Sequence, residues 1–471
     1  GLQDFQWHGM SPTMLSALLI FVALLAACGA LRPHSALGSA HAAQRWNVDS
    51  SLRMANSQID TAAPSMSDLG SAIALVSGTT VGAGIIGLAS VSEKAGFIPS
   101  SLGLLGSWAI MTATGLLIAE VTVNSVKLDG GKTFGIISTT ERLLGKQSSV
   151  VVGTLYLFIH YALLTAYIGE GGEVLSKELH LPDAAGPLLF TAAAGGVMTF
   201  GTNKVIDITN NVCFGLVIAS FLGLVGSGAG AVQVQNLAYM DFGAVRAIVP
   251  ILLLALVFHN VVPSVAAKLR YDKKSIRTAI TLGSLLPLTM FVIWDAVVLG
   301  LIKDYDAVVH STVLLDPLEL LLSNQPAESR AFSEALVTLF TESALITSFI
   351  GFVVGLVEFY SDLLPNKPPR DLSLYCLTLL PPLLLAILDP GVFLSALDIA
   401  GTYGISLLFG ILPALFTFQL RSQFKTAPSD SRAATSPDLE GTYETYIPGG
   451  NAVLYSIISV VCAIVVEKVS I

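Results

Sequence analysis

Near the middle of its first hydrophobic segment, the chain reads Ser77-Gly78-Thr79-Thr80-Val81-Gly82-Ala83-Gly84. This run is poor helix material, because each Gly destabilises a helix interior by roughly 1 kcal/mol relative to Ala. Backbone groups that leave a helix inside a bilayer must find partners in the protein or line a cavity. The run therefore predicts a helix that breaks in mid-membrane, which is typical of a binding site in a secondary transporter.

A second interruption follows far down the chain, at Phe258-His259-Asn260-Val261-Val262-Pro263. Pro263 has no N–H and blocks the hydrogen bond back to His259, so the helix must open there. Two broken helices in one membrane chain predict a solute that is held between them.

The composition argues against a soluble or nucleic-acid-binding protein. Of the 471 residues, 53% are hydrophobic and 12% are charged, against about 25% charged residues in soluble domains. The net charge of -9 leaves no basic face for nucleic acid. The sequence also lacks metal-ligand His/Glu spacing, G-x-S-x-G and a nucleotide-binding glycine loop. Neither an enzyme nor a cofactor is therefore predicted.

Residues 1–67 differ from the rest and predict a targeting leader with a polar tail. Leu15–Ala27 is a 13-residue apolar run, too short to span a bilayer but suited to a signal peptide. Residues 43–67 are polar and resemble a transit segment. A lipoprotein box ending at Cys28 is the weaker alternative, because no Lys or Arg precedes the apolar run. We therefore expect a multi-pass protein of a plastid envelope, or otherwise of the plasma membrane.

Apolar runs of about 20 residues predict eleven membrane spans. They cover residues 69–92, 99–125, 148–170, 185–201, 206–228, 244–267, 276–302, 332–360, 372–388, 391–419 and 449–467. The loops on one side hold fifteen Lys and Arg residues, and those on the other side hold five. This asymmetry predicts that the polar leader lies on the inner side and the C-terminus on the outer side.

The spans predict an all-α fold with an inverted repeat. Residues 68–228 hold five spans and residues 244–419 hold another five, followed by a polar loop at 420–448 and an eleventh helix with the C-terminus at 449–471. An odd number of spans per half means that the second half inserts upside down. Both predicted breaks fall in the first helix of a half, spans 1 and 6, as expected for a site at the pseudo-two-fold axis.

The first break predicts a site for an amino-acid zwitterion. Backbone N–H groups of the half-helix that starts near Gly84 attract a carboxylate. Carbonyl groups of Ser77–Thr79 can accept from an ammonium group or bind sodium. Gly78, Gly82 and Gly84 let the backbone uncoil and come close to the ligand. The alternative is that these small residues only allow close helix packing.

Side chains of other spans complete the predicted site. A His at a proline-induced break in the membrane suits a cavity, so His259 and Asn260 are expected to hold polar groups of the solute. Tyr156 and His160 share one helix face, and Tyr156 is expected to pack on an aromatic ring with Phe258 and Phe349. The alternative is an aromatic stripe that only fills the helix core. The predicted substrate-binding residues are Ser77, Gly78, Thr79, Gly82, Ala83, Gly84, Tyr156, His160, Phe258, His259, Asn260 and Phe349.

A proton is the predicted coupling ion, with sodium as the second choice. Buried acids must face the bundle interior, and Glu120, Asp295, Glu342 and Asp398 fall inside predicted spans. Glu120 is the first candidate for proton coupling, and a structural acid neutralised by helix caps and hydroxyls is the alternative. His259 can also titrate near neutral pH. Thr347 and Ser348 can either ligate a cation or bond the preceding turn of their own helix.

Four motifs resemble the tryptophan/tyrosine permease family of the amino acid-polyamine-organocation superfamily. Gly78–Gly84 resembles its G-T-x-[IV]-G-A-G signature, and Phe258–Ser264 resembles F-H-x-x-V-P-S. Ser348–Gly351, followed by Gly355–Leu356, is similar to S-F-x-G-x-x-x-G-L, and Ile411–Ala414 is similar to the end of span 10. The resemblance covers roughly residues 68 to 467, with the motifs in the same order.

The resemblance implies a LeuT-type fold of eleven spans and proton-coupled uptake of tryptophan, tyrosine or phenylalanine. It also implies that the substrate sits between spans 1, 3, 6 and 8. Bacterial members usually carry a proline soon after the first signature, whereas Ile85–Ser90 has none, so a straighter half-helix is expected here. The leader is foreign to the bacterial proteins and suggests a eukaryotic, plastid-type member.

The sequence thus predicts a secondary active transporter of aromatic amino acids that works by alternating access. One alternative is a carrier of the same fold for another amino acid or an amine. The other is a structural membrane subunit that transports nothing, which fits all the features except the paired breaks.

Overall fold

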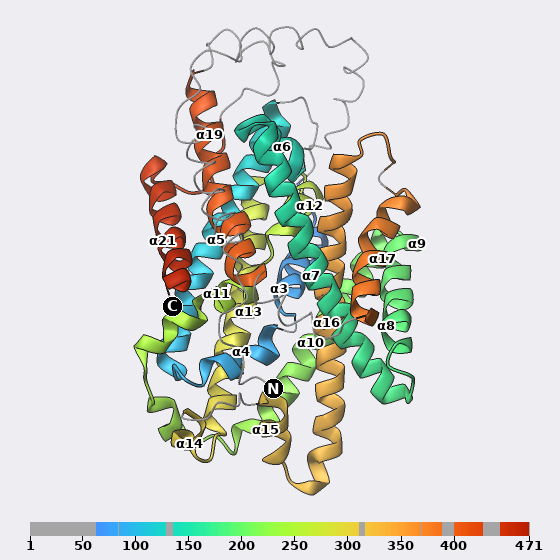
Figure 1. Ribbon diagram of the computed structural model, residues 1–471, viewed down its shortest axis with the longest axis vertical. Helices are drawn as coiled ribbons and strands as arrows, with labels where there is room; N and C mark the ends of the chain where they lie inside the picture. Colours follow the sequence, from blue (N-terminus) through green and yellow to red (C-terminus); the bar gives the residue numbers. More distant parts are fainter. Residues whose placement is uncertain are drawn as a thin grey trace.

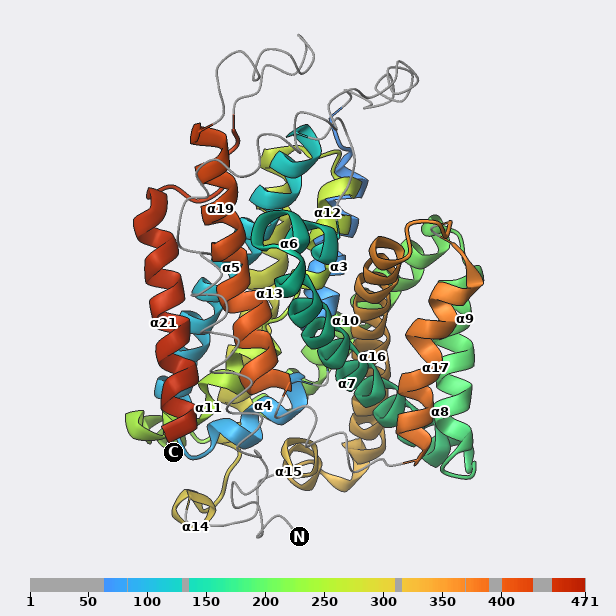
Figure 2. The same ribbon diagram turned by 45° about the horizontal axis from the view of Figure 1, so that its top comes forward.

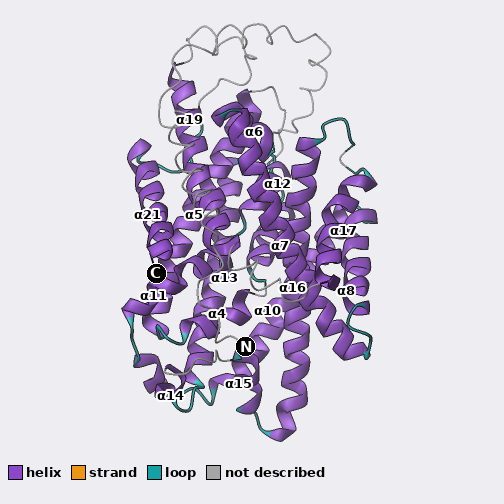
Figure 3. Cartoon of the chain, viewed as in Figure 1, coloured by secondary structure: helices purple, strands orange, loops and turns teal. Residues whose placement is uncertain are grey.

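The computed structural model describes residues 63–82, 84–128, 135–309, 316–368, 370–388, 400–426 and 443–470. The predicted leader up to residue 62, Ala83, Asp398 and most of the predicted loop at 420–448 lie outside the described residues. The described part is built of helices and contains no strand (Figure 3). The predicted all-α class is therefore confirmed.

Seven helices of the described part are long and apolar enough to cross a membrane. They are Phe97–Lys127, Lys146–Leu179, Asn203–Ala229, Phe242–Lys268, Lys273–Gly300, Glu328–Leu363 and Gly404–Phe424. Shorter apolar helices cover Ala185–Phe200, Leu372–Leu388 and Gly450–Val466. Large apolar side chains such as Leu222, Leu282 and Leu384 are exposed, as surfaces that face lipid require. The chain is a multi-pass membrane protein, and the finer count of eleven spans stays a prediction.

The first predicted helix break is present. Helix α3 (Met66–Thr80) begins with a capping box, in which the side chains of Ser65 and Asp68 each accept from the other's backbone N–H. Helix α4 (Gly84–Ser92) follows, and Val81 and Gly82 form non-helical bends between the two helices. The glycine-rich run therefore ends one helix and begins another inside a single hydrophobic segment.

The second predicted break is also present. Helix α11 (Phe242–Ala255) is followed by one 3-10 turn, η6 (His259–Val261), and by helix α12 (Val262–Lys268). Pro263 lies at the start of α12, where its missing N–H costs no helical hydrogen bond and its fixed φ suits the first turn. The proline thus begins the second half-helix.

Long helices surround the two broken ones (Figures 1 and 2). They are α5 (Phe97–Leu128), α7 (Lys146–Leu179), α10 (Asn203–Ala229), α13 (Lys273–Gly300) and α16 (Ala327–Leu363). Helix α3 packs on α10, α13 and α16, while η6 packs on α16, α3 and α5. The two breaks therefore meet inside the bundle, against α16.

The remaining helices lie at two edges of the bundle (Figure 2). One edge holds α8 (Ala185–Phe190), α9 (Gly196–Phe200) and α17 (Leu372–Leu388), and the other holds α19 (Leu412–Thr426) and α21 (Gly450–Ser470). Two stretches are π-helical: η4 (Thr191–Gly195) and η7 (Ala400–Ile411). Such wider turns often occur at functional sites, and η7 packs on α7, α11 and α5 near the centre.

Four short helices lie in regions that the sequence predicts as loops. They are α6 (Ile136–Leu144), η5 (Val234–Ala238), α14 (Tyr305–Val309) and α15 (Pro317–Ser323). Helix α6 packs on α7, α16 and α19. Its nine residues are too few to resemble a membrane span, which is why hydropathy alone does not detect it.

Candidate functional site

The first break is pressed against α16. A Cβ atom at Gly82 would lie 2.6 Å from Ser348 Oγ, and one at Gly78 would lie 2.9 Å from Thr347 Cβ. The Ser348 hydroxyl lies 3.1 Å from the carbonyl oxygen of Gly78 and 3.3 Å from that of Thr79, so it can donate to either. Close packing and carbonyl groups that accept from a side chain thus occur together, because glycine lets Ser348 approach the main chain.

The two predicted cation ligands behave differently. The Thr347 hydroxyl donates to Ala344 O of its own helix at 2.9 Å, whereas Ser348 reaches across to α3. Ser77, at the other side of α3, donates to Gly283 O of α13 at 2.8 Å. Oxygens of Ser348, Gly78 and Thr79 therefore lie together, while Thr347 and Ser77 are engaged elsewhere. Ala83 lies outside the described residues.

Helix α16 also holds the second break. Asn260 donates from Nδ2 to Gly351 O at 2.9 Å, and its Oδ1 atom is buried without a hydrogen-bond partner among the described residues. A Cβ atom at Gly351 would lie 2.2 Å from Thr79 Oγ1, and one at Gly355 would lie 2.9 Å from Asn260 Cβ. These two glycines therefore let both breaks contact the same face of α16.

His259 is positioned by Thr114. Its Nε2 atom lies 2.8 Å from Thr114 Oγ1, and which of the two atoms donates depends on the ring tautomer. Thr114 Oγ1 also lies 3.0 Å from Ile110 O and 3.2 Å from Met111 O. The Nδ1 atom of His259 is buried with no partner among the described residues. The ring stacks between Phe258, at 4.8 Å, and Phe409, at 4.9 Å between ring centroids.

The ring of His160 is fixed by a hydrogen bond to a backbone carbonyl group of its own helix. Its Nδ1–H donates to Tyr156 O at 2.8 Å, because a carbonyl can only accept. The ring stacks on Tyr156 with centroids 3.8 Å apart, and its buried Nε2 atom has no partner among the described residues. The Tyr156 hydroxyl donates to Gly355 O at 3.3 Å. The predicted pairing of Tyr156 and His160 on one face is confirmed.

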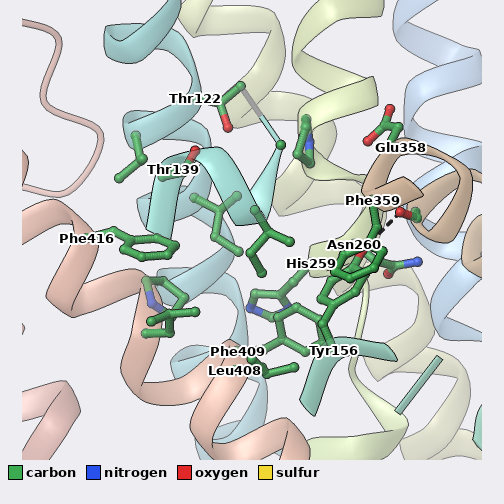
Figure 4. A pocket seen from close by; sticks show the side chains of 18 residues that line it. Thr122, Thr139, Tyr156, His259, Asn260, Glu358, Phe359, Leu408, Phe409 and Phe416 are labelled. Atoms are coloured by element: carbon green, nitrogen blue, oxygen red, sulfur yellow. Dashed lines mark hydrogen bonds between the residues drawn. The ribbon is translucent and has the colours of Figure 1, made fainter. Parts of the chain in front are cut away.

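A cavity of about 70 Å³ lies beside the second break (Figure 4). Its described lining comes from α5, α6, α7, η6, α12, α16, η7 and α19: Ile118, Val121, Thr122, Gly135, Ile136, Thr139, Tyr156, His259, Asn260, Pro263, Gly355, Glu358, Phe359, Leu408, Phe409, Leu412, Pro413 and Phe416. Figure 4 shows the rings of Tyr156, His259 and Phe409 gathered at one end. Aromatic rings and a few polar groups are the usual lining of a small-molecule site.

Only part of the predicted site lines this cavity. Tyr156, His259 and Asn260 do so, whereas the residues of the first break do not. Phe349 is fully buried and meets Phe190 edge-on at 5.5 Å between centroids. Phe258 is likewise buried, packed over Gly115. The cavity and the first break are therefore neighbouring parts that α16 connects.

Sequence reasoning missed several lining residues. Glu358 lies inside the span predicted at 332–360 and could have been found by listing every acid in a span. Phe409 and Phe416 belong to the tenth predicted span, in which the sequence pattern singles out only Asp398 and Ile411–Ala414. Thr139 belongs to α6, and Gly135 is the residue just before that helix, for which the apolar pattern gives no signal.

Glu120, the predicted proton-linked acid, is surrounded by donors. Arg421 donates to its two carboxylate oxygens at 2.7 and 2.9 Å. The Tyr443 hydroxyl donates at 2.7 Å and the backbone N–H of Tyr446 at 2.8 Å. Burial and the Glu120 charge raise the pKa of Tyr443, so its hydroxyl stays a donor. This geometry matches the alternative interpretation of Glu120 as a neutralised structural acid.

The profile of the tryptophan/tyrosine permease family matches residues 65–435. Tyrosine-specific transport system 1 of Haemophilus influenzae is 32% identical over 338 residues, which cover 69% of this chain and 82% of that protein. The tryptophan-specific transport protein of the same organism is 28% identical, and the match covers 83% of this chain and 94% of that protein.

A crystal structure of MhsT in complex with L-phenylalanine is similar in its fold. The TM-score is 0.57 at 16% sequence identity, and the similarity covers 86% of this chain and 100% of that chain. At this identity the similarity concerns the fold alone, and it supports the LeuT-like fold that the sequence motifs imply.

Proposed function

Because the chain belongs to the tryptophan/tyrosine permease family, we propose that it is a secondary active transporter of aromatic amino acids that works by alternating access. The observation that carries the proposal is the meeting of two broken helices on the glycine face of α16, beside an aromatic cavity. Substrate sites of secondary transporters are built from such interrupted helices. The matched relatives, named for tyrosine and tryptophan transport, support the substrate class.

In the proposed binding mode, the two breaks share the substrate. Main-chain groups around Gly78–Gly84 bind its ammonium and carboxylate groups, at the half-helix termini. His259 Nδ1 and Asn260 Oδ1 are buried and have no hydrogen-bond partner among the described residues, and each can form a hydrogen bond with the substrate. Tyr156 and Phe409 offer rings against which an aromatic side chain stacks.

The finer architecture is also part of the proposal. Eleven spans form two inverted sets of five, and the broken helices α3–α4 and α11–α12 each begin one set. A proton drives uptake, with sodium at Ser348 and Thr347 as the second choice. The host membrane is a plastid envelope or otherwise the plasma membrane.

The test is uptake of labelled tryptophan by proteoliposomes that contain the full chain, first under an imposed pH gradient and then under a sodium gradient. We expect the pH gradient to drive accumulation, and unlabelled tyrosine and phenylalanine to compete. Competition by aliphatic amino acids or amines, without competition by aromatic ones, would favour the rival carrier.

Substitutions of two glycines in the same hydrophobic segment distinguish a transporter from a structural subunit. Gly82→Leu should abolish uptake while the protein still inserts, because even a Cβ atom there meets Ser348 Oγ at 2.6 Å. Gly70→Leu is the matched control on the same hydrophobic segment, since a Cβ atom there meets nothing within 4 Å. Uptake that is equal in the two variants would contradict the proposed role of the first break.

A further inference from the structure

Glu358 is an acid that the proposed binding mode leaves unused. It lies on α16, one turn beyond Gly355, and lines the cavity together with His259 and Asn260 (Figure 4). A charged carboxylate inside a membrane span is costly and is retained mainly where it serves a function. Its position in the cavity gives it access to a small solute or ion, which a packed core residue lacks.

One hydrogen bond joins Glu358 to the second broken helix. The Ser264 hydroxyl on α12 donates to its Oε1 atom. Ser264 follows Pro263, so this bond ties the start of the second half-helix to α16. Asn260 makes a parallel link at 2.9 Å to Gly351 O. The protonation state of Glu358 therefore affects the contact between α16 and α12 directly.

The described lining of the cavity offers Glu358 no cationic side chain. Among the described residues that line the cavity there is no Lys or Arg. Titratable or charged side chains on the packed elements are Tyr156 on α7, His259 on η6, Tyr271 after α12, Asp362 on α16, and the ion pair of Lys268 on α12 with Asp207 on α10. The Lys268 charge is thus already matched, with its Nζ 2.5 Å from Asp207 Oδ2.

Asp362, the next acid along α16, is occupied in a different way. It accepts from the backbone N–H of Ser138 on α6 at 2.8 Å and also from the Ser138 hydroxyl. It therefore anchors α6 beside the cavity that Ile136 and Thr139 line. Glu358 has Ser264 as its donor among the described residues, so fewer hydrogen bonds hold its carboxylate than hold that of Asp362.

We propose that Glu358 is the residue that takes up and releases the coupling proton during transport. The step is the binding of one proton to the carboxylate to form the neutral acid, with no other bond made or broken. The neutral acid weakens the attraction for the Ser264 hydroxyl and removes the uncompensated charge, so α12 can move relative to α16. This inference rests on the proposed transport function.

The test compares Glu358→Gln with Glu334→Gln, an exposed glutamate on the same helix. Two assays use proteoliposomes with the full chain: exchange of labelled for unlabelled tryptophan without an ion gradient, and accumulation under an imposed pH gradient. Glu358→Gln should retain exchange, with its dependence on pH flattened, and lose gradient-driven accumulation. Glu334→Gln should behave as the original protein in both assays.

Two further variants test the proton role of Glu358 independently of Glu358→Gln. Glu358→Asp retains a titratable group and should restore part of the gradient-driven accumulation, and Ser264→Ala should shift the pH dependence of exchange. Accumulation by Glu358→Gln at the original level, or loss of exchange as well in a correctly inserted protein, would overturn the inference. Failure of the unaltered protein to exchange tryptophan would instead overturn the proposed function. Exchange with sodium-driven accumulation only would leave that function standing and remove the proton role.

Discussion

Two acids inside the helix bundle, Glu120 on α5 and Glu358 on α16, meet opposite surroundings. Glu120 is fully buried and receives two bonds from Arg421, one from Tyr443 and one from the Tyr446 backbone. Glu358 is partly buried, lines a cavity and receives a bond from Ser264. The carboxylate of Glu120, with its full set of donors, joins segments of the bundle, whereas that of Glu358 lies at a cavity wall that a solute or ion can reach.

The largest expected effect comes from breaking the Glu120 ion pair. Arg421→Met leaves Glu120 buried without its cation, and removing one partner of a buried pair costs about 3–5 kcal/mol. We expect a large fall in thermal stability of the detergent-purified protein, measured by fluorescence-detected unfolding. Glu358→Gln should change the unfolding temperature far less, because it leaves no buried charge without a partner.

A double substitution sharpens this first prediction. Glu120→Leu combined with Arg421→Met removes both charges, and replacing a whole buried pair by apolar groups is often neutral or stabilising. The double variant should therefore be more stable than Arg421→Met alone. Equal destabilisation of the two variants would mean that Arg421 acts through its bonds to Ile447 O and Gly450 O.

The next effect in size concerns the tyrosine that faces Glu120. Tyr443→Phe removes a hydrogen bond to a charged acceptor, which is worth about 1.5–3 kcal/mol. The raised pKa of Tyr443 sets the pH window. The stabilisation is fully present below the ordinary phenol pKa of about 10 and is lost only as the pH rises through the higher folded-state value. Unfolding temperatures of the two proteins should therefore differ by the same amount across neutral pH.

Features that depend on neighbouring residues could be predicted from the sequence, whereas features that depend on a distant helix could not. Both helix breaks were predictable, because Gly82 and Pro263 act on the backbone within one turn of themselves. The contact of His259 with Thr114 and that of Ser348 with α3 were not, since each depends on a partner on a distant helix. Hydropathy locates spans but does not say which faces of them meet.

The surroundings of Glu120 and Glu358 were not predictable, because they are formed by segments that lie far away along the chain. Glu120 and Arg421 are 301 residues apart in sequence, so no pattern indicates that the acid is already neutralised. Glu358 lies at the end of its predicted span, where an acid is ordinarily taken to face the membrane surface. Helix α6 closes part of the cavity although it is too short to be detected by hydropathy. The polar partners of each acid thus appear only when the helices are packed together.

The smallest effect is expected at the edge of the Glu120 network. Lys127 Nζ lies 2.6 Å from Glu444 Oε1, with 34% and 26% of the two side chains exposed. Ion pairs with this access to solvent contribute about 0–1 kcal/mol. Lys127→Met should therefore shift the unfolding temperature only slightly, and added salt should reduce the difference. Lys177→Met is the matched control, because its partner Glu173 lies in a still more exposed pair. A loss as large as that of Arg421→Met would mean that Glu120 and Glu444 act as one cooperative anchor for the segment before α21, rather than as a buried pair with a weak fringe.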